Sequence, residues 1–179
     1  QEEPSPKEDL EKIPLLKRED LKKEIVKLTN EECEVAGVPA LYHDVFTSGI
    51  HYVDFMFDIK HIRQEDLPYV GLLKAVLGYV DTEHYGYADL SNEIDLQTGG
   101  ISNNILVTAD VEHIEEYSLK FEIRTKFLDD KTGAALRLVK EIICSSNLDD
   151  EKRLYEIIAQ GKSRLQMAIG GMGHYMAGM

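Results

Sequence analysis

Histidine is the side chain whose spacing would first reveal metal or acid–base chemistry, and the chain contains six. A helical zinc motif needs two histidines four residues apart, and no pair has that spacing. His113 comes nearest because Glu116 follows three residues later, but Tyr117 stands where the second ligand would be. This motif also falls in a predicted turn that leads into a strand, so the sequence predicts no metal site. The other histidines are His43, His51, His61, His84 and His174.

The remaining residues that could carry chemistry are better explained by structural roles. His51 lies on the apolar face of a predicted strand and should be a hydrogen-bonded histidine at the edge of the core. Each aspartate pair, 129–130 and 149–150, precedes a predicted helix, so these residues are interpreted as turn residues and helix caps. Cys33 and Cys144 are too few and too far apart for a disulfide framework, which favours structural thiols in a reducing cytoplasm. The residues alone therefore predict no catalytic group.

Charge is the strongest feature of the composition. The chain has 20 basic and 33 acidic residues, a net charge of −13, which argues against nucleic acid as the main partner. Lys74 and Lys120 bound a stretch without any Lys or Arg that holds nine acids. Such a stretch either attracts basic peptides or is only a solvated acidic face. The candidates for a peptide-facing acidic surface are Asp81, Glu83, Asp89, Glu93 and Asp95, and the other four acids are Asp110, Glu112, Glu115 and Glu116.

The spacing of apolar residues predicts the elements that must position these side chains. A strand at 41–46 should pair through a turn at 47–49 with a long strand at 50–58. Helices are expected from Asp66 through Val80, at 87–96, at 132–145 and from Asp149 or Asp150 through Ile169, with strands at 101–110 and 117–128. Because turns of hairpin length join neighbouring strands, we expect an α+β fold: a largely antiparallel sheet with helices packed on one face.

The two ends of the chain differ from its centre. Residues 1–34 are densely charged and are interpreted as a linker with a short amphipathic helix at 19–28 that leads into a domain at 35–179. From Leu165 onward there is no charged residue apart from His174, so we expect this end to pack against further structure of a longer domain. No apolar run is long enough to cross a bilayer, and the N-terminus has no signal-peptide pattern.

Separated motifs occur in a fixed order along the chain. They are His-Asp-Val-Phe-Thr-Ser-Gly-Ile at 43–50, Tyr-Val-Asp-Phe-Met-Phe-Asp at 52–58, Asp-Leu-Pro-Tyr at 66–69, Tyr-Gly-Tyr-Ala-Asp-Leu-Ser at 85–91, Thr-Gly-Gly-Ile-Ser at 98–102 and Gly-His-Tyr at 173–175. Together they resemble the second half of presequence-protease-type peptidases, a branch of the pitrilysin/insulinase family. The resemblance implies the repeated α+β domain of that family, in which four such domains form two halves around a peptide-sized chamber. This chain resembles the third domain, preceded by the connector between the halves.

The family's zinc site can be compared with this chain position by position. Its first domain carries His-x-x-Glu-His, with two zinc ligands and a glutamate base. Alignment on the following Val-Leu-Gly places Tyr69, Leu72 and Leu73 at those positions, and none of them can bind zinc or move a proton. The resemblance therefore implies a degenerate copy with core-type residues there. The residues that hold substrate in such enzymes come from the fourth domain and cannot be assigned here.

The prediction is a non-catalytic domain of a cytoplasmic zinc metallopeptidase, a hydrolase that degrades short unfolded peptides. The domain would supply chamber wall and contacts between the halves, without catalytic or metal-binding residues of its own. Zinc would belong to the parent enzyme, and the partners would be the remaining domains of the same polypeptide and peptide substrates, with no nucleic acid and no membrane. The alternative is an independent protein- or peptide-binding module without peptidase activity.

Overall fold

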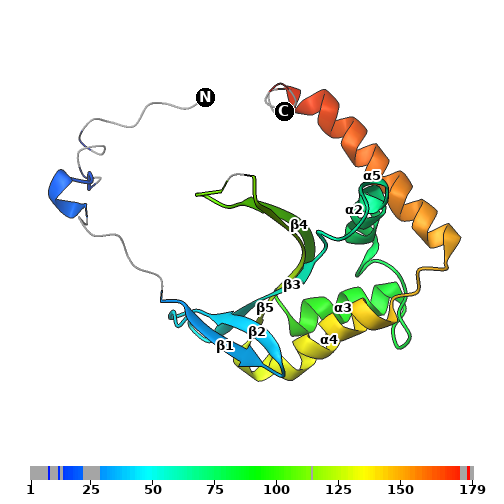
Figure 1. Cartoon of the computed structure of the whole chain (residues 1–179), viewed down its shortest axis with the longest axis horizontal. Helices are drawn as coiled ribbons and strands as arrows, with labels where there is room; N and C mark the ends of the chain where they lie inside the picture. The colour runs from blue at the N-terminus through cyan, green and yellow to red at the C-terminus, as the bar shows by residue number, and fades with distance from the viewer. Residues whose placement is uncertain are drawn as a thin grey trace. The chain divides into compact units, whose positions relative to one another are not determined.

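The chain forms two compact units, residues 1–46 and 47–179, in a computed structural model that describes residues 8, 12, 14–21, 29–113, 115–173 and 177 (Figure 1). The division falls after Phe46, inside the region that the sequence analysis assigns to the second domain. The domain boundary at residue 34 stays a prediction.

The first unit contains a short β-hairpin. Strand β1 (Glu31–Val35) pairs antiparallel with β2 (Val38–Tyr42). Ala36 and Gly37 both have positive φ, 52° and 82°, as a tight two-residue hairpin turn requires. The predicted strand at 41–46 is therefore wrong, because β2 ends at Tyr42 and its partner precedes it in the chain. Of the predicted helix at 19–28, residues 22–28 lie outside the described residues, while η1 (Arg18–Asp20) is a 3-10 turn.

The second unit is built on a three-stranded antiparallel sheet. Its strands are β3 (Ile50–Asp58), β4 (Ile101–Ala109) and the long central β5 (Tyr117–Leu128), in the order β3-β5-β4. The predicted hairpin partner of β3 is thus replaced by β5, which pairs with β3 from Ile50–Leu128 to Asp58–Lys120. The remaining elements are η2 (Gln64–Asp66), α2 (Leu67–Val76), α3 (Tyr87–Gln97), η3 (Asp129–Lys131), α4 (Thr132–Ser145) and α5 (Glu151–Gly171).

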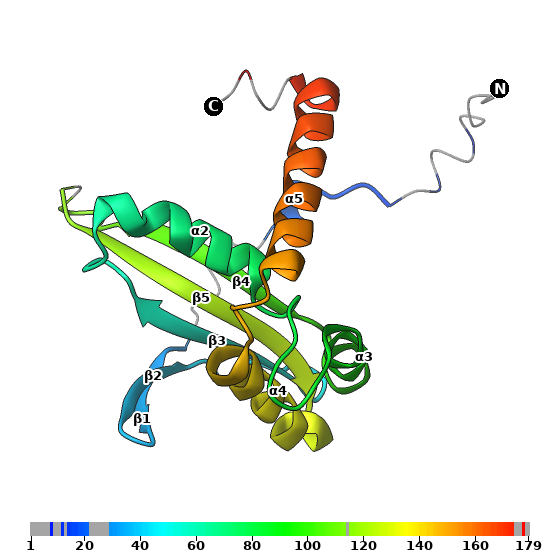
Figure 2. The same cartoon turned by 90° about the vertical axis from the view of Figure 1, so that its right-hand side faces the viewer.

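The core lies between one face of the sheet and the helices. Phe121, Ile123 and Phe127 on alternate positions of β5 are buried, and Leu138 and Ile142 of α4 belong to the same core. Figure 2 shows α2 and α4 against the same side of the sheet. The expected α+β architecture, with an antiparallel sheet and helices on one face, is confirmed.

Most helix boundaries agree with the predictions, and α2 is the exception. The expected stripe continues to Val80, but α2 ends at Val76 because Gly78 turns the chain with a φ of 88°. Leu77 and Val80 are nevertheless buried, so their apolar character was a sign of the core and not of helix length. For α5 the predicted cap is confirmed, since the Asp150 side chain accepts the backbone N–H of Arg153 at 3.0 Å.

Candidate functional site

The five acidic candidates lie around α3 and the loop before it. The Asp81 carboxylate accepts the backbone N–H of Tyr87 at 2.7 Å and so caps the start of α3. Glu93 is half-buried and accepts the side-chain amide of Gln97. The remaining candidates, Glu83, Asp89 and Asp95, are exposed. Asp81 and Glu93 therefore have structural partners. The peptide-facing role of all five acids stays a prediction.

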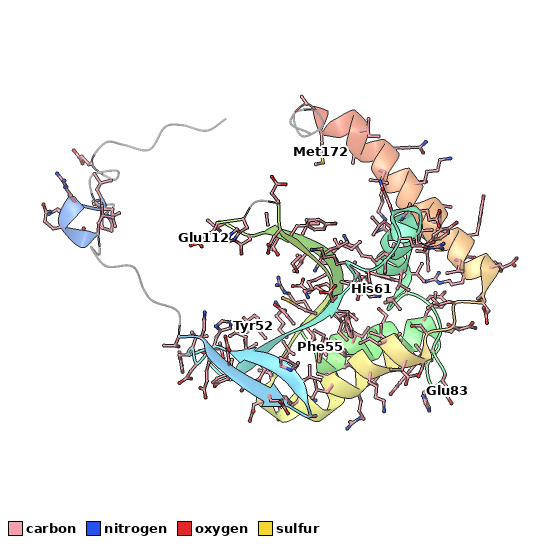
Figure 3. All side chains as sticks on the ribbon, viewed as in Figure 1. Tyr52, Phe55, His61, Glu83, Glu112 and Met172 are labelled. Carbon is pink, nitrogen blue, oxygen red and sulfur yellow. The ribbon has the colours of Figure 1, made fainter. Side chains whose placement is uncertain are left out.

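The other four acids lie at the far end of the sheet, in the turn between β4 and β5. Strand β4 has nine residues, which span about 30 Å, between the two groups. Figure 3 shows Glu83 and Glu112 at opposite ends of the unit. The nine acids are contiguous in sequence, but a whole strand separates them into two groups in the structure.

Asp110 organises this turn. Its Oδ1 accepts the backbone N–H groups of Glu112 at 2.7 Å and His113 at 3.0 Å. The bond from His113, followed by that from Glu112, lowers the pKa of Asp110 because both stabilise the carboxylate. The His113 ring also lies 3.6 Å from Asp110. Within the described ranges no three His, Cys, Asp or Glu side chains gather as metal ligands.

The structure places His51 and the two cysteines in different environments. His51 Nε2 lies 2.8 Å from Asp129 Oδ1, and its ring stacks on Phe127 with centroids 5.7 Å apart. This confirms a hydrogen-bonded histidine at the edge of the core. Cys33 and Cys144 are both exposed free thiols, so neither fills the core. Among the helices that the structure describes, none has the length and apolarity to span a bilayer.

The open face of the sheet carries a polar network that the sequence analysis missed. Arg124 donates two hydrogen bonds to Asp54, at 2.8 and 2.9 Å, and a third to Glu122 at 3.0 Å. The second oxygen of Glu122 accepts the Asn104 amide at 3.0 Å. Glu122 is only 1% exposed, so its charge depends on these two partners. The signal was present in sequence as alternating charges on β5, at Lys120, Glu122, Arg124 and Lys126.

The electrostatics of this face are balanced. The hydrogen bond to Asp54 raises the pKa of Arg124, and the one from Lys120 lowers the pKa of Asp58. Lys120 and Arg124 therefore pair with three acids on this surface, and Lys126 adds a third base at the next alternate position of β5. Beside them lies a depression of about 490 Å³ between β3, β5 and the start of β4. It is lined by Tyr52, Asp54, Gly99, Gly100, Ile101, Ser102, Arg124, Thr125 and Lys126. Such a surface can form hydrogen bonds and ion pairs with the polar backbone and side-chain groups of a polypeptide.

Comparison with known proteins identifies the class of this α+β domain. The family model "Peptidase M-16C associated" matches residues 1–179. The chain is 42% identical to Protein HypA of Clostridium perfringens over 99% of its length, and 30% identical to presequence protease 1 of Arabidopsis thaliana, also over 99%. It is 27% identical to the mitochondrial presequence protease of Drosophila melanogaster over 86%. The chain belongs to this peptidase-associated family, and it spans 14–18% of the length of these relatives.

The three positions aligned with the family's zinc motif lie on α2. Tyr69 is 68% exposed and Leu72 is 40% exposed, whereas Leu73 packs against the core. The expectation of core-type residues at all three positions is therefore wrong for Tyr69 and Leu72. A phenol and two aliphatic side chains do not fit the imidazole and carboxylate ligands that zinc prefers in peptidases. These positions of α2 offer zinc no site.

Proposed function

We propose that this chain is a non-catalytic domain of a zinc metalloendopeptidase that degrades short unfolded peptides in the cytoplasm. The observation that carries the proposal is the match of the whole chain to the peptidase-associated family, together with relatives named presequence proteases. The side chains at the aligned zinc positions support a role without its own metal. Zinc and the catalytic base would come from another domain of the same polypeptide.

The domain would contribute a wall of the peptide chamber and contacts with the other domains. The polar network on this face of the sheet suits contact with unfolded peptides, because it offers both charge signs and hydrogen-bonding groups beside the exposed side chains of Tyr52 and Met56. The exposed apolar residues of α5 suit contact with another domain. These are Leu165, Met167 and Ile169, and the exposed Met172 follows directly after the helix.

Two experiments test the proposal. Sequencing the gene outward from both ends should reveal an upstream His-x-x-Glu-His, and the longer polypeptide should bind zinc and lose peptide cleavage on chelation. The 179-residue chain alone, supplied with zinc, should bind no stoichiometric metal by elemental analysis and cleave no peptide by mass spectrometry. Zinc-dependent cleavage by this chain alone would overturn the proposal. A gene without the upstream motif would favour the independent binding module instead.

A further inference from the structure

Lys126 differs from the other bases on the open face of β5, because its ammonium has no acidic partner in the described part of the chain. Lys120 pairs with Asp58 at 2.7 Å, and Arg124 pairs with Asp54 at 2.8 Å. Lys126 lies on the same face, two residues after Arg124, and its side chain makes neither an ion pair nor a hydrogen bond within the described ranges. In a chain with a net charge of −13, this position leaves a positive charge available to an anion.

Gly99 fixes where the Lys126 side chain lies. A Cβ atom at position 99 would be 2.6 Å from Cε and 2.7 Å from Cγ of Lys126, so the aliphatic stem of the lysine lies directly against the glycine backbone. The backbone N–H of Gly99 also donates to the carbonyl oxygen of Lys126 at 2.7 Å, which holds the two segments together. Only glycine allows this close approach, and any side chain at position 99 would displace the lysine.

The backbone beside Lys126 is held in place by further hydrogen bonds. The N–H of Gly100 donates to the Thr98 hydroxyl at 3.0 Å, and the C=O of Gly100 accepts the Thr125 hydroxyl at 3.0 Å. Thr125 is only 1% exposed, and Gly100 has a φ of 109°, which side-chain-bearing residues rarely adopt. The floor of the depression lined by these residues is therefore formed before any ligand binds, which lowers the entropic cost of binding.

Three further hydrogen-bond donors line the depression of about 490 Å³ beside Lys126. Tyr52 lies opposite Lys126 on β3, and Ser102 lies opposite Arg124 on β4. Neither hydroxyl makes a hydrogen bond in the described part of the chain. Arg124 uses Nε and Nη2 for its bonds to the two neighbouring acids, which leaves Nη1 to line the depression. Figure 3 shows Tyr52 on the open face and Phe55 towards the helices. An ammonium with several neighbouring N–H and O–H donors is the arrangement that binds an anion.

The acids around the depression limit which anion it accepts. Asp54 lines it, and the buried Glu122 lies beside Arg124. Two negative charges so close would repel a phosphate dianion or a polyanion. A carboxylate carries a single negative charge, which matches the single unpaired ammonium of Lys126, and its two oxygens can accept from the ammonium and a hydroxyl at once. The charge balance therefore favours a carboxylate.

We propose that the depression beside Lys126 binds one carboxylate group of a peptide, from an acidic side chain or from a free C-terminus. The Lys126 ammonium would pair with the carboxylate, and the hydroxyls of Tyr52 and Ser102 would donate hydrogen bonds to it. The inference rests on the proposed function, because it takes the ligand to be a peptide. It gives this acidic domain a site for the opposite kind of ligand from the one that its net charge attracts.

The test titrates the whole isotope-labelled 179-residue chain with short peptides of Gly and Ser whose N-termini are blocked. One peptide has a central glutamate and an amidated C-terminus, the second a central glutamine and a free C-terminus, and the third a central glutamine and an amidated C-terminus. The first or the second should shift the backbone amide signals of Gly99, Gly100 and Ser102 in NMR spectra, and the third should not. Which of the two binds identifies the source of the carboxylate. Binding should weaken with salt, since the ion pair is exposed.

Matched variants locate the site. Lys126→Met removes the charge of an exposed side chain and keeps an aliphatic stem, and Lys140→Met removes the same charge from an exposed position of α4. We expect Lys126→Met to weaken binding about fivefold and Lys140→Met to leave it unchanged. Gly99→Ala keeps the charge but displaces the lysine stem, so it should also weaken binding. Circular dichroism of all three variants checks that they fold. If Gly99→Ala fails to fold, the comparison of the two lysine variants decides.

Several outcomes would overturn the inference. They are failure of both carboxylate peptides to bind, equal binding of the uncharged peptide, undiminished binding by Lys126→Met or by a folded Gly99→Ala, and equal weakening by Lys140→Met. Zinc-dependent cleavage by the chain alone would refute the proposed function while leaving carboxylate binding intact, so the two failures are distinguishable.

Discussion

Glu141 shows how a single carboxylate fixes the loop before α3 onto α4. Its side chain is 12% exposed and accepts hydrogen bonds from the backbone N–H of His84 at 3.1 Å and from the His84 ring at 3.0 Å. Burial by itself would raise the pKa of Glu141, but hydrogen bonds from Thr82 and His84 outweigh it and lower the pKa. The ionised form is therefore favoured by the folded state.

The lowered pKa of Glu141 gives a stability effect with a defined pH dependence. Because the folded pKa lies below the unfolded one, the stabilisation is complete at neutral pH and is lost as the pH falls below the ordinary carboxyl range. Glu141→Gln should lower the free energy of unfolding by about 1 kcal/mol at pH 7, and by clearly less near pH 3. Urea denaturation at both pH values measures this. Glu83→Gln, an exposed glutamate of the same loop, is the control. An equal loss at both pH values would assign the effect to packing instead.

At the scale of elements, sequence periodicity predicted the limits of amphipathic helices and strands, but it did not predict which strands pair with one another. The limits of α4 and β5 agree with the predictions because each alternates or repeats over at least 12 residues. The predicted partner of β3 was wrong, because alternation shows which face of a strand is buried and not which strand lies beside it. For the same reason the burial of Glu122 was missed, since it depends on cross-strand neighbours such as Asn104.

The cap of α5 was predictable because capping is local, and it can be tested as an element-scale effect. The Asp150 carboxylate accepts the N–H of Arg153, one of the donors that the first turn of a helix leaves unpaired. Asp150→Ala should therefore lower the free energy of unfolding by about 1 kcal/mol in thermal or urea denaturation. Asp149→Ala is the matched control, since it removes the same charge one position earlier. Equal losses for the two variants would mean that the charge matters and the cap does not.

At the scale of the whole molecule, charge and core are distributed differently. The net charge of −13 is carried by both units, whereas the buried core cluster runs from Ile59 to Ile142 and lies wholly within residues 47–179. The sequence analysis localised nine acids correctly along the chain but could not see that β4 separates them. Residues that follow one another in sequence form one surface patch only when no extended element, such as β4, lies between them.

The position of the core predicts that residues 47–179 fold without the first unit. A fragment of these residues retains all three strands β3, β4 and β5 and every buried residue of the core cluster. It should unfold in one cooperative transition, with a Tm within about 4 °C of the full chain, because a stability change of about 1 kcal/mol produces a shift of that size. Calorimetry of both proteins measures this.

A fragment of residues 60–179 is the control: it lacks β3, so β5 loses one of its two partner strands and Phe121 and Phe127 lose part of their cover. That shorter fragment should show no cooperative transition. If the 47–179 fragment behaves in the same way, the second unit is not an independent folding unit, because its core then requires residues of the first.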